Sequence, residues 1–232
     1  MRPIESPRSK KDLVYEALRD AILEGDLEPG ERIVIDELAE SLHVSPIPVR
    51  EALQRLQAEG FVTIEPYVGV SVTELHEGLI SEIFDLLEAL EVLSTRSACR
   101  RMGEKDLDEM EAILRRMDGL VDQPNRFSQE NVRLHQFICE RANTPLVQSL
   151  MSKTLAHWDR LRRHYLKDVF ADRISEAQRE HWKMLNALRA HDAQRVERIV
   201  RTHNRTAHAA YARHLQRLGI LSTTMIQGER QC

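Results

Sequence analysis

Cysteine is scarce in this chain of 232 residues. The three that it has are Cys99, Cys139 and Cys232, widely spaced and without a C-x-x-C pair. This spacing predicts neither a disulfide framework nor a cysteine zinc site. Aromatic residues, which favour strands, make up only 5% of the chain, whereas charged residues reach 30%. We therefore expect a mainly α fold.

Long apolar runs are also missing. No segment approaches the roughly 18 consecutive apolar residues that indicate a transmembrane helix. The opening segment, MRPIESPRSKK, lacks the apolar stretch of a signal peptide. The protein is therefore predicted to be cytoplasmic, with no membrane partner.

An excess of positive charge is absent too. The net charge is −4, and residues 1 to 75 hold 8 Lys and Arg against 15 Asp and Glu, a net charge of −7. A nucleic-acid-binding domain usually carries a basic surface, so any DNA contact in this region must come from local basic residues. The basic residues that we expect at DNA are Arg2, Arg8, Lys10, Lys11 and Arg50.

A helix start is present in the segment LAESLHVSPIPVREALQRLQAEG. Pro46 and Pro48 fit a first turn, because the N–H groups there have no intrahelical partner. Ser45 precedes them and is predicted to be the N-cap, its hydroxyl accepting a backbone N–H. The apolar stripe that follows is Val49, Ala52, Leu53 and Leu56. A shorter apolar-patterned segment, 35–42, lies just before, so two helices joined by a turn are predicted.

The neighbouring segments complete a winged helix-turn-helix domain over residues 1–75. An amphipathic helix is predicted over 11–24, and DLEPGERIVI is predicted as a turn. The apolar stripe of that helix is Leu13, Ala17, Leu18, Ala21 and Ile22. Two β-rich runs around the turn 66–69 predict a hairpin.

The second helix of such a motif enters the major groove with its first residues against base edges. The residues predicted at these positions are Ser45, Ile47, Arg50 and Gln54. An arginine there can bind guanine bidentately. The alternative interpretation is that Arg50 only pairs with neighbours on a solvated helix face.

From Glu77 onward the periodicity becomes helical throughout. Helices are predicted over 78–102, 104–119, 126–141, 145–169, 172–190 and 192–218. We assign residues 78–220 to an all-helical domain and residues 221–232 to a flexible tail.

Three of these helices carry a histidine where an apolar residue is expected: His135, His181 and His203. An apolar core does not readily solvate three imidazoles, and imidazole is a common ligand of zinc, nickel, copper and iron. The pattern therefore predicts a metal site. The alternative is three core histidines, each satisfied by a neighbouring hydrogen bond.

The segment LAESLHVSPIPVREALQRLQAEGFV, with PGERI upstream and Gly69 downstream, resembles the signature of GntR-type bacterial transcription regulators. The resemblance implies operator binding by Ser45 and Arg50, with the Gly69 wing in the minor groove. Many relatives carry a basic residue at the wing, where this chain has Tyr67 and Val68.

The histidine spacing, 46 residues and then 22, resembles the FCD effector-binding domain that accompanies one branch of that family. The resemblance implies an antiparallel helical bundle, a homodimer, and a divalent transition metal held near a small carboxylate effector. The implied ligands are Asn131, His135, His181 and His203, with zinc expected first and nickel or manganese as alternatives. Asn131 replaces the family's aspartate with a weaker oxygen ligand, so either the metal binds less tightly or an anion completes the site.

The anion-binding residue is a second departure from the FCD pattern. Leu87 stands where relatives often place an arginine that clasps a carboxylate. Arg162 is an alternative effector-binding residue, although DRLRRHYLKD is most simply a solvated basic face.

These features together predict a ligand-responsive transcription regulator, a repressor rather than an enzyme, that binds double-stranded operator DNA as a homodimer. A metal-independent regulator with an apolar or acyl-type effector is one alternative. A metal-dependent hydrolase is another, but it would need a carboxylate base beside an open metal position, and no such pair lies near the histidines in the sequence.

Overall fold

The computed structural model describes residues 9–222, which fall into two compact units that meet between Leu75 and His76. We describe each unit by itself. Arg2, Arg8 and nearly all of the predicted tail 221–232 lie outside the described residues.

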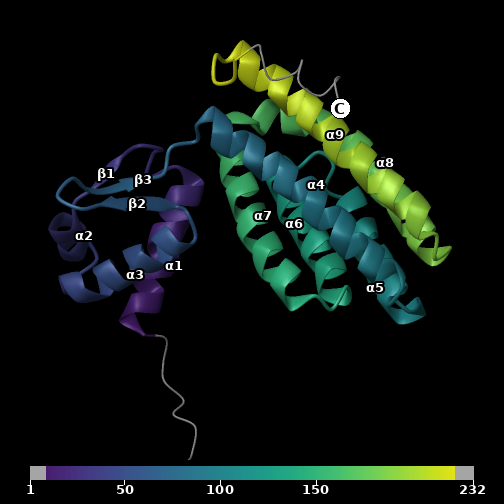
Figure 1. The fold of residues 1–232 in the computed structure, drawn as a ribbon, viewed down its shortest axis with the longest axis horizontal. Coiled ribbons are helices and arrows are strands. Elements are labelled where there is room, and N and C mark those ends of the chain that lie inside the picture. Colours follow the sequence, from purple (N-terminus) through teal and green to yellow (C-terminus); the bar gives the residue numbers. More distant parts are fainter. Residues whose placement is uncertain (1–8, 223–232) are drawn as a thin grey trace, which may run out of the picture. The chain divides into compact units, whose positions relative to one another are not determined.

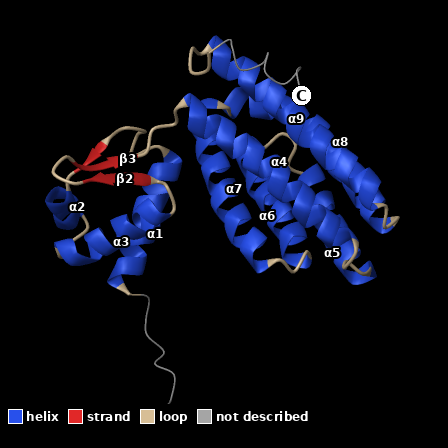
Figure 2. Ribbon diagram, in the orientation of Figure 1, coloured by secondary structure: helices blue, strands red, loops and turns tan. Residues whose placement is uncertain are grey.

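The N-terminal unit is a winged helix-turn-helix (Figure 1). Its elements are α1 (Lys10–Glu24), β1 (Arg32–Ile33), α2 (Ile35–Ser41), α3 (Pro46–Ala58), β2 (Val62–Glu65) and β3 (Gly69–Val72). The sheet is antiparallel with the order β1-β3-β2, and Thr63 lies opposite Ser71 in the hairpin (Figure 2). The predicted hairpin is thus present. The segment DLEPGERIVI is more than the turn that we predicted, because it holds β1, a strand too short to show an alternating pattern.

The core of this unit lies between α1 and α3. Val49 and Leu56 are buried, as predicted. On α1 the predicted stripe is right at Leu18 and Ile22, which are buried, but wrong at Leu13, whose side chain is 51% exposed. Val14 and Tyr15 are buried in its place. The Tyr15 ring lies 3.6 Å from the Arg55 guanidinium, and its hydroxyl donates to Glu59 Oε2. An aromatic ring therefore forms part of the α1 contact with α3.

The C-terminal unit is an antiparallel helical bundle, which confirms the predicted fold class (Figure 1). Its helices are α4 (Glu77–Cys99), α5 (Glu104–Asp118), α6 (Pro124–Arg141), α7 (Pro145–Tyr165), α8 (Lys167–Arg189) and α9 (Ala193–Arg217). Helix α4 packs against α6, α7 and α9, and α8 packs against α5 and α9.

The boundary between α7 and α8 differs from the prediction. We placed it at 169–172, but the helices are separated by a single residue, Leu166, with φ −116° and ψ 12°. No glycine or proline marks this break, so the sequence carries no local signal for it. Within residues 9–222, no helix is long and apolar enough to cross a membrane.

Candidate functional site

The start of α3 presents the residues predicted to face DNA. Ser45, Arg50 and Gln54 are exposed, and the Ile47 side chain is 66% exposed. Ser45 is the N-cap residue, but its hydroxyl makes no capping hydrogen bond. The prediction of that bond is wrong: Pro48, at the third helical position, has no N–H to donate, and the N–H of Ile47 at the second position makes no bond to the Ser45 hydroxyl. The Ser45 hydroxyl therefore remains at the surface.

Arg50 does not pair with a neighbouring side chain. Within residues 9–222 its side chain takes part in no hydrogen bond or ion pair. The alternative interpretation, in which Arg50 pairs with neighbours on a solvated helix face, is therefore wrong. Arg55, one turn further along α3, is by contrast held by Glu59 and Asp12. The guanidinium of Arg50 is thus the one on this helix that remains available.

The wing is fixed by an arginine that the sequence analysis missed. Arg32 on β1 donates from Nη2 to the carbonyl oxygen of Val68 at 3.0 Å. Gly69 has φ +129°, a region that favours glycine, and a Cβ there would lie 3.4 Å from Arg32 Nη2. Tyr67 and Val68 at the tip are fully and 62% exposed. Arg32 lies in the PGERI segment, and the resemblance of that segment to the GntR signature could have identified Arg32 as a residue of interest.

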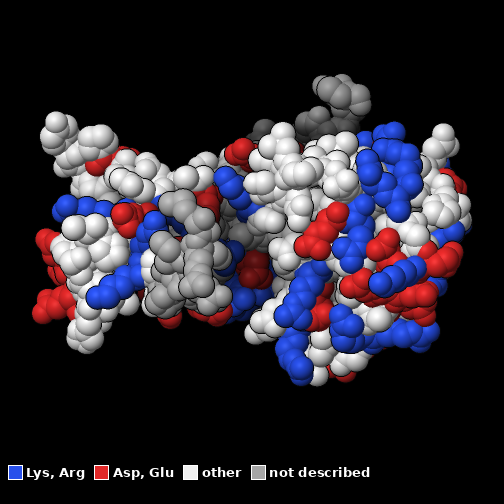
Figure 3. Space-filling view, turned by 90° about the horizontal axis from the view of Figure 1, so that it is seen from below, with Lys and Arg blue, Asp and Glu red and all other residues white. Residues whose placement is uncertain are grey.

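On the face that Figure 3 shows, basic and acidic side chains are interspersed rather than separated. This distribution agrees with the acidic balance of residues 1–75. A DNA contact by this unit therefore depends on a few exposed basic groups.

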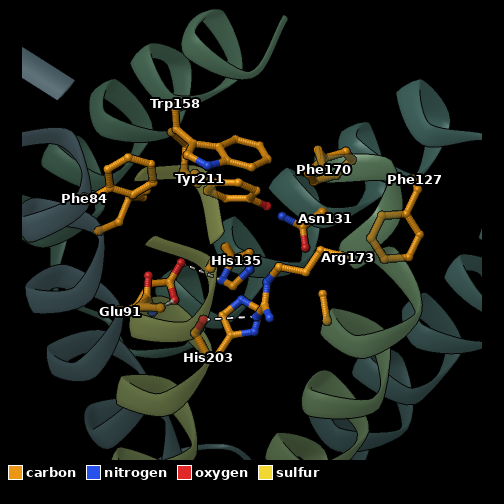
Figure 4. A pocket seen from close by; sticks show the side chains of 15 residues that line it. Phe84, Glu91, Phe127, Asn131, His135, Trp158, Phe170, Arg173, His203 and Tyr211 are labelled. Carbon is orange, nitrogen blue, oxygen red and sulfur yellow. Dashed lines mark hydrogen bonds and ion pairs between the residues drawn. The ribbon is translucent and has the colours of Figure 1, made fainter. Parts of the chain in front are cut away.

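The second candidate site lies inside the bundle, where three helices bring three histidines together. His135 comes from α6, His181 from α8 and His203 from α9. Figure 4 shows His135 and His203 in the wall of the adjoining pocket. All three are buried, and one ligand nitrogen from each lies within 4.8 Å of the others. The prediction that all three point inward is confirmed.

Two carboxylates hold two of these imidazoles. Glu91 Oε1 lies 2.9 Å from His135 Nδ1, and Glu180 Oε2 lies 2.7 Å from His203 Nδ1. These contacts leave Nε2 of each ring as the free ligand atom, an arrangement that is common around metal-binding histidines. Burial alone would raise the pKa of the Glu91 carboxyl, but His135 and His203 lower it below its usual value. The pKa of Glu180 is lowered in the same way by His203 and Arg173.

His181 is the least exposed of the three, and its environment suits a metal ligand. Its Nε2 is buried and has no hydrogen-bond partner, while Nδ1 lies 3.4 Å from Gln178 Oε1. Burial, followed by the other two histidines, lowers its pKa well below the usual value. The neutral form, which is the form that binds metal, is therefore favoured. The residues present fit a divalent ion of the zinc type.

Glu91 and Glu180 place negative charge beside the histidines, which the sequence did not lead us to expect. We expected an ion held by neutral ligands to lack compensation, but two anionic carboxylates lie in direct contact with two of those ligands. Glu91 falls on the same inward stripe of its helix as Leu87, and Glu180 precedes His181 directly. A charged residue on an inward stripe is the signal that could have identified Glu91.

A cavity of about 40 Å³ adjoins the histidines. Its lining consists of Phe84, Leu87, Glu91, Phe127, Asn131, His135, Leu155, Trp158, Phe170, Arg173, Ala177, His203, Asn204, Ala207 and Tyr211. Asn131 is therefore beside two of the three histidines, at the position where the family's aspartate is expected. His181 is not part of the lining.

Arg162 does not line this cavity. It is buried, donates from Nε to Asp159 at 3.1 Å and lies over the Phe170 ring at 5.3 Å. The alternative of a solvated basic face is wrong, because Arg160 and Arg162 are both buried. Burial lowers the pKa of Arg160 to about 10.

Arg173 is the arginine inside the cavity. Its Nη2 donates to Glu180 at 2.7 Å and to the carbonyl oxygen of His203 at 3.2 Å, and its Nη1 donates to Glu176. Arg173, Ala177 and His181 fall at intervals of four residues on α8. This spacing places Arg173 on the same inward face of α8 as His181, and it could have identified Arg173 from the sequence.

Comparisons with known proteins agree with both units. Residues 10–72 match the profile described as bacterial regulatory proteins, gntR family, and residues 82–206 match the FCD domain. The HTH-type transcriptional regulator McbR of Escherichia coli is 30% identical over 177 residues, covering 72% of this chain and 77% of that protein. The HTH-type transcriptional repressor RspR of Escherichia coli is 25% identical over 192 residues, covering 82% and 83%.

Solved structures share the fold. The structure of E. coli McbR/YncC matches with a TM-score of 0.72 at 22% identity, covering 89% of this chain and 99% of that one. A putative GntR transcriptional regulator from Rhodococcus sp. RHA1 matches with a TM-score of 0.69 at 23% identity, covering 92% and 99%. The relatives named here are transcriptional regulators, which supports a regulator rather than a hydrolase.

Proposed function

Because the chain belongs to the GntR family of bacterial regulatory proteins and carries an FCD domain, we propose that it is a ligand-responsive transcriptional repressor. It binds operator DNA as a homodimer and is controlled by a small organic acid bound beside a divalent metal. The observation that carries this proposal is an exposed, unpaired Arg50 in one unit together with an enclosed three-histidine cluster in the other.

In the DNA-binding half, Arg50 reads a guanine in the major groove. Ser45 contributes its uncapped hydroxyl to a backbone phosphate, a contact that helix starts favour. Ile47 and Gln54 flank Arg50 on the same exposed face. Arg32 holds the wing turn so that Gly69 can approach the minor groove closely.

In the effector half, His135, His181 and His203 hold the ion, with Asn131 as a weak or indirect fourth ligand. A bound divalent ion, zinc in the first instance, supplies positive charge for an incoming carboxylate. Arg173 is the second cationic partner, taking the role that Leu87 cannot fill. Arg162 acts indirectly, because it packs on Phe170 in the cavity wall.

A two-fold dimer explains how one recognition helix per chain can reach an operator with two half-sites. Acid binding changes the spacing of the two heads, and it releases DNA. The coupling is reciprocal, so the acid binds less tightly to the DNA-bound dimer by the same factor.

The test uses the full-length protein and DNA from upstream of its own gene. Gel-shift titrations with zinc-loaded protein are expected to give a dimer on DNA that a small organic acid dissociates. Sedimentation analysis measures the dimer separately. A monomer in solution and on DNA, or DNA binding that no acid alters, would contradict the corresponding part of the proposal.

A further inference from the structure

The aromatic residues of this chain are few, and they are concentrated at the cavity. Five of the eleven Phe, Tyr and Trp residues line it. They are Phe84, Phe127, Trp158, Phe170 and Tyr211, one each from α4, α6, α7, α8 and α9. Each helix that borders the cavity therefore contributes one ring to its wall.

These rings form an uneven wall rather than a parallel stack. Trp158 meets Phe170 edge-on, with centroids 5.7 Å apart at 68°. Phe127 lies 6.3 Å from Phe170 at 58°, and Phe84 lies 6.0 Å from Tyr211 at 30°. A planar ring placed among them would meet both edges and faces, the contacts that aromatic rings prefer.

The cavity has a polar side and an aromatic side (Figure 4). Glu91, His135 and His203 lie on one side, while Phe84, Trp158 and Tyr211 lie together on the other. A ligand that spans the cavity therefore has one charged end and one apolar end. A second carboxylate would face either Glu91 or the aromatic wall, and both are unfavourable.

We propose that the effector is a small planar aromatic monocarboxylate, with its carboxylate toward Arg173 and the histidines and its ring among the five aromatic side chains. This inference rests on the proposed acid-responsive function and narrows it to one ligand class. Polyhydroxylated acids such as sugar acids fit less well, because Asn131, Asn204 and Tyr211 are few partners for many hydroxyls that would lose water against a mostly apolar wall.

The size of the cavity also favours a flat ligand. Its volume of about 40 Å³ holds about three water molecules, so a ring must displace side chains to enter. A planar ring requires less displacement than a puckered one of the same carbon count. Arg173 is the long side chain in the cavity. Its contacts with Glu176 and Glu180 lie within its own helix, and its bond to the carbonyl oxygen of His203 on α9 is the one that must break if it moves toward a ligand.

Trp158 provides a direct fluorescence reporter. The only other tryptophan is Trp182, which does not line the cavity and whose Nε1 donates to Asp118. A Trp182→Phe variant of the full chain thus leaves one reporter, in the cavity wall. Zinc-loaded Trp182→Phe protein is titrated with benzoate, cyclohexanecarboxylate and gluconate, and calorimetry on the wild type provides a second measurement.

Benzoate is expected to bind about ten-fold more tightly than cyclohexanecarboxylate, the effect of about two favourable ring contacts. Gluconate is expected to bind more weakly than both. Equal affinity for benzoate and cyclohexanecarboxylate would overturn the aromatic assignment. Gluconate binding as tightly as benzoate would overturn the inference but leave the acid-responsive function standing. If none of the three acids bound, the effector half of the proposed function would fail together with the inference.

A matched pair of variants tests the wall itself. Phe84→Leu keeps an apolar side chain and removes one ring, whereas Phe137→Leu makes the same change at a buried position outside the cavity. Benzoate affinity is expected to fall several-fold in the first variant and to stay unchanged in the second, with cyclohexanecarboxylate little affected in either. Equal losses in both variants would contradict a specific ring contact. The wild-type comparison of the three acids needs neither variant to fold.

Discussion

The two units place their functional residues in opposite ways. In the N-terminal unit the candidate residues Ser45, Ile47, Arg50 and Gln54 lie on one exposed helix face, within ten positions of the sequence. In the C-terminal unit Glu91 and His203 are 112 positions apart, yet both are buried at the same cavity. A local surface motif can lose one side chain without disturbing its neighbours. A buried cluster cannot, because Glu91 and His203 are each paired with another buried member, which their loss would leave without that partner.

The largest expected effect is on operator affinity, and it should leave the C-terminal unit unchanged. Arg50→Ala should lower operator affinity by at least ten- to one-hundred-fold, because a bidentate guanine contact is worth about 1–3 kcal/mol and each dimer has two. The melting temperature and the metal affinity should not change, since the Arg50 side chain makes no hydrogen bond or ion pair within residues 9–222. Gel shifts and thermal melts measure both, and Arg55→Ala is the comparison on the same helix. Unchanged operator affinity would remove Arg50 from the interface.

His181→Ala is the converse experiment on the buried cluster. Saturating zinc should raise the melting temperature of the wild type by about 5–10 °C, the shift that about 2.7 kcal/mol of binding linkage produces at this chain length. The variant should lose this shift while keeping DNA binding. His208→Ala, on α9 but outside the cluster, is the matched control. An undiminished zinc-induced shift in His181→Ala would mean that the ion binds elsewhere.

Glu91→Gln tests whether the carboxylates beside the histidines serve the metal. Removing the charge behind His135 should weaken zinc binding by about 10–100-fold, the usual cost of losing such a partner. Glu88→Gln changes a carboxylate on the same helix that pairs instead with Arg201 and Arg205. Competition with a zinc indicator measures both affinities, and equal effects in the two variants would argue against a role for Glu91.

The smallest expected effect concerns Asn131→Asp. The added carboxylate should tighten zinc binding and weaken binding of an acid effector, each by about ten-fold or less. Asn125→Asp adds the same charge to α6 outside the cavity. Titration of zinc and then benzoate into each variant measures both affinities. If both shifted in the same direction, Asn131 would not lie between the metal and the acid.

The same contrast explains what the sequence could predict. Helix periodicity and the Pro46 start gave the winged helix-turn-helix, because those signals lie within a few residues of each other. The three histidines were predicted to point inward from their own helices. Glu91, Glu180 and Arg173 were missed as partners, because which residue faces which across helices depends on packing that no local pattern records. Arg162 was predicted to bind the effector because of its charge. Its burial beside Asp159 is likewise a feature of the tertiary packing that the sequence does not record.

The cavity has a consequence for how the bundle moves. Five helices contribute to its lining and α5 contributes none. An occupant would therefore tie α4, α6, α7, α8 and α9 into one cooperative opening unit, while α5 could still detach by local unfolding. In amide hydrogen exchange the bound state would slow exchange in those five helices together and leave α5 comparatively unchanged. Ligand binding would thus stabilise the five helices that line the cavity but not α5.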